Sequence, residues 1–129
     1  MPGRALLDTS AAAAFLRGDQ RLSDIITELD EVYTSVVAVG ELLYGARYSS
    51  NSAANLERVA SFVAAIVVLP CDDDTAEVYA RVKQALRTKG RPIPDNDLWI
   101  ASAAMQHGLA LVNRDAHFDQ IEGLERETW

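Results

Sequence analysis

Short apolar segments alternate along the chain with longer segments in which apolar residues recur at helical spacing. Short apolar runs bounded by turn-forming residues are typical of buried strands, whereas the longer segments are typical of helices. The pattern predicts strands at residues 4–7, 32–34, 67–69 and 109–112, and an edge strand at 124–128. It predicts helices over residues 10–15, 21–29, 36–48, 53–65, 72–89 and 96–107, and a short helical turn at 116–121.

Residues that begin or end helices stand at the boundaries of several of these segments. We expect Thr9 or Ser10, then Ser35 and Ser52, to cap helix N-termini, because their hydroxyls accept hydrogen bonds from free backbone N–H groups. We expect Gly90 to end the long helix before it. Strands alternating with helices indicate an α/β protein with a parallel sheet, and the pattern leaves the strand order open.

The length of 129 residues corresponds to one domain, which we expect to span residues 1–129. The single cysteine, Cys71, excludes an intramolecular disulfide and fits a reducing compartment. Arg4 and Asp8 interrupt the N-terminal apolar stretch, which argues against a signal peptide. Since no apolar run approaches the roughly 20 residues of a membrane-spanning helix, we expect a cytoplasmic protein with no membrane segment.

The formal net charge of −7 argues against a general nucleic-acid-binding protein. The charge is uneven, however, because several of the basic residues gather in one predicted helix and the loop after it. These residues are Arg81, Lys83, Arg87, Lys89 and Arg91. They form either a solvated helix face or a local stripe that holds RNA phosphates beside an acidic site, and composition does not decide between the two.

Three aspartates stand at the ends of predicted elements. Asp8 and Asp115 follow predicted strands, and Asn96 or Asp97 begins a predicted helix. Each aspartate alone is explained by a helix cap or a local turn. In open parallel sheets, however, binding sites form outside the carboxyl ends of the strands, which is where Asp8 and Asp115 are expected.

Glu41 is less easily explained, because it is the single charged residue in the apolar segment 36–46. Glutamate is rarely buried without a partner. The glycines Gly40 and Gly45 are each less favourable than alanine inside a helix by about 1 kcal/mol, which suggests a close approach of another group. Glu41 either pairs with a base such as Arg47 or joins the three aspartates.

Convergence of four carboxylates would require a neutralising group, and the usual one is a divalent metal. Carboxylate oxygens are ligands for hard cations such as Mg²⁺. His107, His117 and Cys71 lack the spacing of a softer metal site. We expect His107 to lie on the surface and His117 to be structural, with a role beside Asp115 left open.

Other hydrolytic and phosphotransfer sites lack the residues that they need. The chain contains neither a Gly-x-Ser-x-Gly motif nor a phosphate-binding P-loop. Ser10 stands where an aspartyl-phosphate hydrolase would have a second acid, and no lysine follows Lys89 to complete a phospho-receiver site.

Four motifs then occur in order: Leu-Leu-Asp-Thr-Ser at 6–10, Val-Gly-Glu-Leu-Leu-Tyr-Gly-Ala at 39–46, Pro-Asp-Asn-Asp-Leu-Trp-Ile-Ala at 94–101, and Leu-Val-Asn-Arg-Asp-Ala-His-Phe at 111–118. Together with Gly123-Leu124 they resemble the PIN-domain family, and within it the VapC-type toxins, over nearly the whole chain. The resemblance implies an α/β three-layer sandwich with a central parallel sheet of about four to five strands flanked by helices.

The resemblance also implies which residues form the site. Asp8, Glu41, Asp97 and Asp115 match the family's four acidic positions, with Asp8 and Asp97 as the leading direct metal ligands. The expected supporting side chains are Thr9, Asn96 and Asn113. Asn113 stands where the family commonly has Thr or Ser, which puts a hydroxyl-mediated role in doubt, and Asp95 is an additional acid.

The activity implied by the resemblance is that of an endoribonuclease dependent on Mg²⁺ or Mn²⁺. The implied partners are RNA, a VapB-like antitoxin and a second copy of the chain in a homodimer or a higher toxin–antitoxin assembly. Two alternatives are a PIN-like binding scaffold with a silent site and a DNA or flap nuclease, which the small size disfavours. Partner or dimer contacts could come from Leu42, Tyr44, Tyr48, Leu98 and Trp99, although we expect Leu42 and Leu98 to lie in the core.

Overall fold

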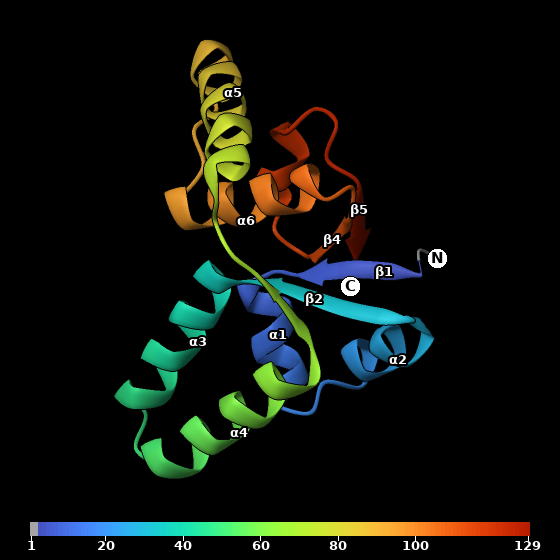
Figure 1. Ribbon diagram of the computed structural model, residues 1–129, viewed down its shortest axis with the longest axis vertical. Coiled ribbons are helices and arrows are strands. Elements are labelled where there is room, and N and C mark those ends of the chain that lie inside the picture. The colour runs from blue at the N-terminus through green and yellow to red at the C-terminus, as the bar shows by residue number, and fades with distance from the viewer. Residues whose placement is uncertain (1–2) are drawn as a thin grey trace.

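The computed structural model describes residues 3–129 and is built around a parallel sheet (Figure 1). Its strands are β1 (Arg4–Leu7), β2 (Glu31–Ser35), β3 (Val67–Leu69), β4 (Ala110–Asn113) and β5 (Arg126–Thr128). They pair in the order β3-β2-β1-β4-β5, and every pairing is parallel. The predicted parallel α/β fold, including the edge strand near the C-terminus, is confirmed.

Helices cover both faces of the sheet and make a three-layer molecule, with α5 and α6 on one side and α1, α2 and α4 on the other (Figure 1). No described helix combines the length and the apolar character needed to cross a bilayer. The helices are α1 (Thr9–Leu16), α2 (Gln20–Glu28), α3 (Val36–Tyr48), α4 (Ser52–Ala65), α5 (Asp73–Lys89), α6 (Asp95–Gln106) and the 3₁₀ helix η1 (Ala116–Gln120).

The central strand β1 contributes to both halves of the core. Leu6 packs into the cluster that contains Leu98, whereas Ala5 and Leu7 pack into the cluster that contains Phe62. Successive side chains of a strand point to opposite faces of a sheet, so a strand buried on both faces is apolar throughout. This double burial explains why the predicted strands are short continuous apolar runs.

The first helix begins one residue earlier than the hydroxyl residues indicated. Asp8 is the N-cap of α1, and its Oδ1 accepts a 2.8 Å hydrogen bond from the backbone N–H of Ala11. Of the two caps that the sequence indicated for this helix, Asp8 is therefore confirmed, and the prediction that Thr9 or Ser10 caps it was wrong. A carboxylate at this position also interacts favourably with the positive end of the helix dipole.

Two other helix starts differ from prediction by a residue or two. Asn51 is the N-cap of α4 without a side-chain capping bond, and Ser52 is the first helical residue rather than the cap. Helix α6 begins at Asp95, because Pro94 holds an extended conformation (φ −56°, ψ 140°) directly before it. Asp97 therefore lies within the first turn of α6 instead of starting it.

Ser35 begins α3 and Gly90 ends α5, as predicted. Ser35 accepts a 3.1 Å hydrogen bond from the N–H of Val37 at the start of α3. Gly90 ends α5 with φ +69°, a left-handed conformation that glycine adopts without steric cost.

The strand order creates a crevice between β1 and β4. The chain proceeds from β1 through β2 to β3 on one side, and β4 and β5 are then added on the other side of β1. The backbone N–H of Asp8 donates a 3.1 Å hydrogen bond to the carbonyl of Val112, which ties the two strand ends together. Ligand sites of open α/β sheets form at such switch points, outside the carboxyl ends of the strands.

Candidate active site

Asp8 lies at the switch point between β1 and β4, directly after β1. Its residue surface is 2% exposed, and its carboxylate caps α1. Asp8 therefore lies at the carboxyl edge of the sheet, where the backbone N–H groups at the start of α1 can donate hydrogen bonds to it. This placement makes Asp8 both a structural cap and a buried acid.

The electrostatics of Asp8 show that the other three acids converge on it. Its pKa is raised from 3.8 to about 6, first by burial and then by the negative charges of Asp97, Asp115 and Glu41. The hydrogen bond from the N–H of Ala11 opposes this rise. The four acids, spread over residues 8–115, are therefore close enough in the fold to repel one another, whereas their joint role as metal ligands stays a prediction.

Asp97 reaches the crevice from the first turn of α6. Burial raises its pKa, nearby His117 lowers it, and the charges of Glu41 and Asp115 raise it. His117 Nε2 lies 3.1 Å from Asp97 Oδ2, within ion-pair distance but not aligned for a hydrogen bond. The sequence placed His117 beside Asp115 and left its role open, whereas in the fold it contacts Asp97.

Glu41 projects from α3 and is held by α1 through a side-chain hydrogen bond. Thr9 Oγ1 donates to Glu41 Oε1 at 2.6 Å. The alternative partner considered from the sequence, Arg47, makes no ion pair with Glu41 within residues 3–129. Thr9, Glu41 and Asn96 line one open hollow of about 670 Å³, so the site has room for a ligand.

Asp115 follows β4 and is the N-cap residue of η1. Asn113 does not reach the acids: its amide donates to the Leu111 carbonyl at 3.0 Å and accepts from Arg126 Nη2 at 2.8 Å. Arg126 Nη2 also donates to the Asp115 carbonyl at 3.3 Å. Asn113 therefore holds Arg126, and Arg126 in turn supports the loop that carries Asp115. The sequence patterns did not predict this role of Arg126.

The four acids are suited, as ligands, to a hard divalent cation. All four are carboxylates, and their mutual repulsion at Asp8 is the energetic cost that such a cation removes. Within residues 3–129, no group of three or more His, Cys, Asp or Glu side chains already encloses a point where an ion would sit. Metal binding would therefore require these carboxylates to turn toward one another.

Asp95 belongs to a different arrangement from its neighbour Asp97. Its carboxylate accepts from Tyr79 Oη at 3.0 Å and from Lys83 Nζ at 3.2 Å. These two bonds lower the pKa of Asp95 below its usual value. Tyr79 stacks on Trp99 with ring centroids 3.9 Å apart, so Trp99 is packed within the chain.

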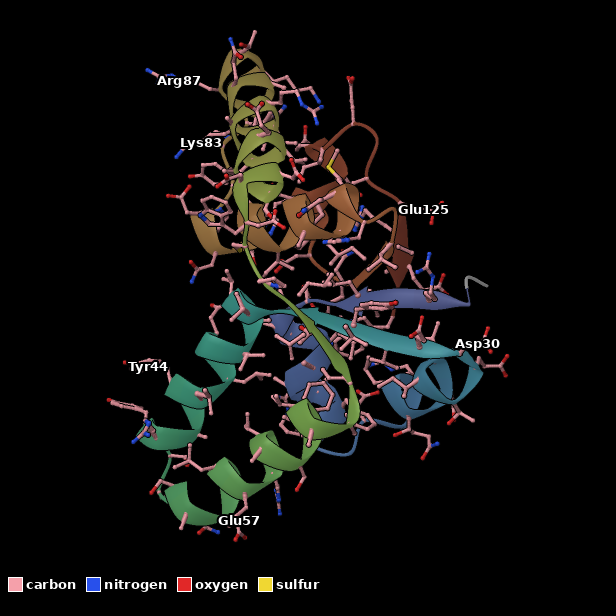
Figure 2. All side chains as sticks on the ribbon, viewed as in Figure 1. Asp30, Tyr44, Glu57, Lys83, Arg87 and Glu125 are labelled. Carbon is pink, nitrogen blue, oxygen red and sulfur yellow. The ribbon has the colours of Figure 1, made fainter. Side chains whose placement is uncertain are left out.

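The basic residues do not form a single stripe. Residues two apart on a helix point about 200° away from each other, whereas residues four apart share a face. Lys83 and Arg87 extend to the side of α5 on which the N-terminus of α6 lies (Figure 2). Lys89 bonds the Gln120 carbonyl at 2.7 Å and lines a separate hollow with Arg81. RNA contacts by these residues and by Arg91 stay a prediction.

The apolar candidates for partner contacts divide into core and surface. Leu42 and Leu98 are buried, as expected. Tyr44 and Tyr48 are 69% and 82% exposed, and they stack on each other along α3 with centroids 6.1 Å apart.

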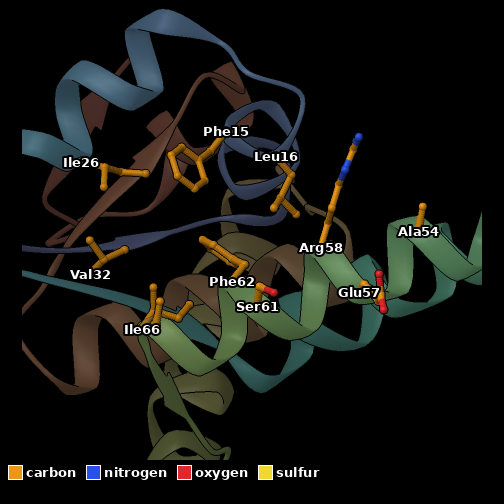
Figure 3. A pocket seen from close by; sticks show the side chains of 11 residues that line it. Phe15, Leu16, Ile26, Val32, Ala54, Glu57, Arg58, Ser61, Phe62 and Ile66 are labelled. Atoms are coloured by element: carbon orange, nitrogen blue, oxygen red, sulfur yellow. The ribbon is translucent and has the colours of Figure 1, made fainter.

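A hollow of about 750 Å³ lies between α1, α2, β2 and α4, and none of the four acids lines it (Figure 3). Apolar side chains such as Phe15, Ile26 and Phe62 form its floor. Glu57 and Arg58 lie toward one end. The apolar floor is suited to a hydrophobic segment and lacks an acid cluster for hydrolysis.

Comparison with known proteins agrees with this geometry. A family model described as PIN domain matches residues 5–124. Ribonuclease VapC5 of Mycobacterium tuberculosis is 35% identical over 124 residues, covering 95% of this chain and 90% of that protein. The tRNA(fMet)-specific endonuclease VapC of Shigella flexneri is 35% identical over 96 residues, covering 74% of this chain and 73% of that protein.

A solved structure of DNA-bound VapBC from Salmonella typhimurium superposes with a TM-score of 0.90 at 26% identity, covering 100% of this chain and 99% of that chain. The resemblance inferred from the motifs is thereby confirmed, together with the three-layer fold. The family model and the two relatives show that the chain belongs to the PIN-domain family and groups there with the VapC ribonucleases.

Proposed function

We propose that this chain is a metal-dependent endoribonuclease, the toxin of a type II toxin–antitoxin pair, acting on RNA in the cytoplasm. The observation that carries the proposal is the convergence of Asp97, Asp115 and Glu41 on the buried Asp8 at the switch point of the sheet. Two relatives named as ribonucleases, one of them specific for tRNA(fMet), support RNA as the substrate.

The proposed metal is Mg²⁺ or Mn²⁺, with Asp8 and Asp97 as direct ligands and Glu41 and Asp115 binding directly or through water. When bound, the ion supplies an activated water and neutralises charge on the phosphodiester. Thr9 holds the Glu41 carboxylate in place through its 2.6 Å hydrogen bond. His117 favours the ionised form of Asp97, which keeps an oxygen lone pair free for the ion.

The proposed protein partner is a VapB-like antitoxin. The solved neighbour from Salmonella is a VapBC complex, which supports a partner of this kind. The apolar groove between α1, α2 and α4 suits an amphipathic segment of such a partner (Figure 3). A homodimer is also proposed, and Tyr48 is exposed enough to contribute to one.

The test is cleavage of RNA by the purified protein with Mn²⁺, with Mg²⁺ and with EDTA. Wild-type protein should cut RNA only when metal is present. Asp97→Asn should lose cleavage while keeping its circular dichroism spectrum and its melting transition, because the substitution removes charge without changing shape. Asp95→Asn is the matched control, since Asp95 is bonded to Tyr79 and Lys83 and should leave cleavage nearly unchanged.

Two outcomes would favour the alternatives. A binding scaffold would show neither cleavage nor stabilisation by Mn²⁺. A DNA nuclease would cut single-stranded or branched DNA in preference to RNA of the same sequence. Mapping the cleavage ends in total RNA after brief expression, with Asp97→Asn as the control, would identify the substrate.

A further inference from the structure

Tyr44 lies beside the acids but is packed against little of the fold. Its side chain is 69% exposed and projects from α3 away from the body of the molecule (Figure 2). Residues three apart on a helix are neighbours on its surface, so Tyr44 is adjacent to Glu41. Both residues line the same hollow of about 670 Å³.

Gly40 lines this hollow as well, and packing within the chain does not explain it. A Cβ built on Gly40 would meet no other atom within 4 Å, although glycine is less favourable than alanine inside a helix. Gly40 has ordinary helical geometry, so it is not needed for a left-handed conformation. Its bare backbone leaves space for a ligand between the Tyr44 ring and the Glu41 carboxylate.

An exposed aromatic ring beside a phosphodiester-cleaving site is suited to hold an unpaired base. Single-stranded RNA is commonly recognised by stacking its bases on aromatic side chains, whatever their sequence. The hollow falls within the range of about 300–1,000 Å³ that is usual for ligand sites. Asn96, which lines the same hollow from α6, has an amide that can hydrogen-bond to a base or a ribose.

We propose that Tyr44, with Gly40 and Asn96, forms a nucleobase-binding subsite that stacks one base of single-stranded RNA next to the bond being cut. The inference rests on the proposed ribonuclease function. Tyr44 positions the substrate and takes no part in proton transfer or metal binding. Its contribution is therefore to substrate affinity and to the choice of the cleaved bond.

The competing occupant of this surface is a second copy of the chain. Val36, Gly40, Tyr44 and Tyr48 recur every four residues and so lie along one side of α3. A dimer would use the whole row, including Tyr48, whereas a base subsite needs only the part beside Glu41. Tyr48 does not line the hollow, which makes it the matched control.

Binding is measured without cleavage in an Asp97→Asn background, using a fluorescein-labelled single-stranded RNA of twelve mixed-sequence nucleotides. Tyr44→Ala should weaken binding by about 5- to 100-fold, the effect typical of losing one stacked base. Tyr44→Phe keeps a stacking ring and should bind within about twofold of the parent, and Tyr48→Ala should do the same. Equal affinity of Tyr44→Ala and its parent would overturn the proposal.

A second measurement separates stacking from a general loss of fold or charge. The same RNA is prepared with single abasic nucleotides, one position at a time. With Tyr44 present, one abasic position should weaken binding more than the others, and this difference should disappear with Tyr44→Ala. If every position has the same effect in both proteins, no base is held by Tyr44.

Three further outcomes distinguish the subsite from a dimer face and from failure of the proposed function. If light scattering shows that Tyr44→Ala and Tyr48→Ala both dissociate an oligomer, and binding falls equally in both, the row is a dimer face and the subsite is refuted. If wild-type protein with Mn²⁺ cuts no RNA, the proposed function fails. If wild type cuts RNA and Tyr44→Ala cuts it with the same kcat/KM, the subsite proposal is refuted and the proposed function stands.

Discussion

Thr9 Oγ1 donates a 2.6 Å hydrogen bond to Glu41 Oε1, which joins the first turn of α1 to the middle of α3. The two residues are 32 positions apart in the sequence. Thr9 directly follows Asp8, the cap of the same helix, so one turn of α1 fixes two of the four acids. The geometry of the site therefore depends on how α1 packs against α3.

Thr9→Val should lower cleavage activity by about 10- to 100-fold, because valine keeps the shape of threonine but cannot donate to Glu41. The free energy of unfolding should fall by about 1–3 kcal/mol, the usual effect of losing a hydrogen bond to a charged group. Thr9→Ser, which keeps the hydroxyl, is the control. Wild-type activity in Thr9→Val, measured at saturating Mn²⁺, would show that Glu41 needs no such support.

Asp8→Asn should stabilise the metal-free protein at neutral pH. The pKa of Asp8 is raised from 3.8 to about 6, so between these values the folded state holds a proton that the unfolded state releases. The free energy of unfolding therefore falls as the pH rises through this window, by about 3 kcal/mol in total. Asparagine keeps the capping oxygen but has no charge to desolvate.

The free energies of unfolding of wild type and Asp8→Asn should consequently differ little below pH 3.8 and most above pH 6. Urea denaturation in EDTA at several pH values measures this difference. Added Mn²⁺ should reverse the order at pH 7.5 by stabilising the wild type more than Asp8→Asn. A variant that is less stable than wild type at pH 7.5 without metal would contradict the burial and repulsion inferred at Asp8.

His117→Gln should weaken metal binding more at low pH than at high pH. His117 lowers the pKa of Asp97, so its loss lets that pKa rise further. Asp97 must be ionised to bind a cation, and a higher pKa leaves more of it protonated in mild acid. Calorimetric titration with Mn²⁺ at pH 6 and pH 8 measures the effect, with the exposed His107→Gln as the control. An equal loss at both pH values would assign His117 a packing role instead.

Local sequence patterns predicted most of the fold because β1, β3 and β4 are built around short apolar runs, although β5 is polar. The exceptions are helix starts, where neighbouring polar residues compete for the cap, as Asp8 does with Thr9. The strand order was not predictable, because it depends on how helices pack across the sheet. That order brings Asp8 beside Val112 and so creates the crevice.

For the site, the motifs indicated the four acids, whose role as metal ligands stays a prediction, whereas no motif indicated the contacts that support them. The pairing of His117 with Asp97 joins η1 to α6 through space. Arg126 supports the Asp115 loop from β5, and no spacing in the sequence indicates either contact. Asn113 has a role other than the one expected, because its amide is engaged by Leu111 and Arg126.

Ser61→Glu should block binding of the protein partner and leave RNA cleavage intact. Ser61 is an exposed residue of α4 that lines the apolar groove, and none of the four acids lines it (Figure 3). A carboxylate there would have to be desolvated by an apolar segment entering the groove, which is costly without a paired cation. Co-expression with a VapB-like antitoxin, followed by affinity capture, measures the loss.

Ala60→Glu is the matched control, since Ala60 is the exposed neighbour of Ser61 on α4 and does not line the groove. It should capture the partner as well as wild type does. Ser61→Glu should keep its RNA cleavage when assayed alone and should lose only its inhibition by the partner. Equal capture by both variants would place the partner's main contacts outside the groove, whereas loss of cleavage by Ser61→Glu would couple the groove to the acid site.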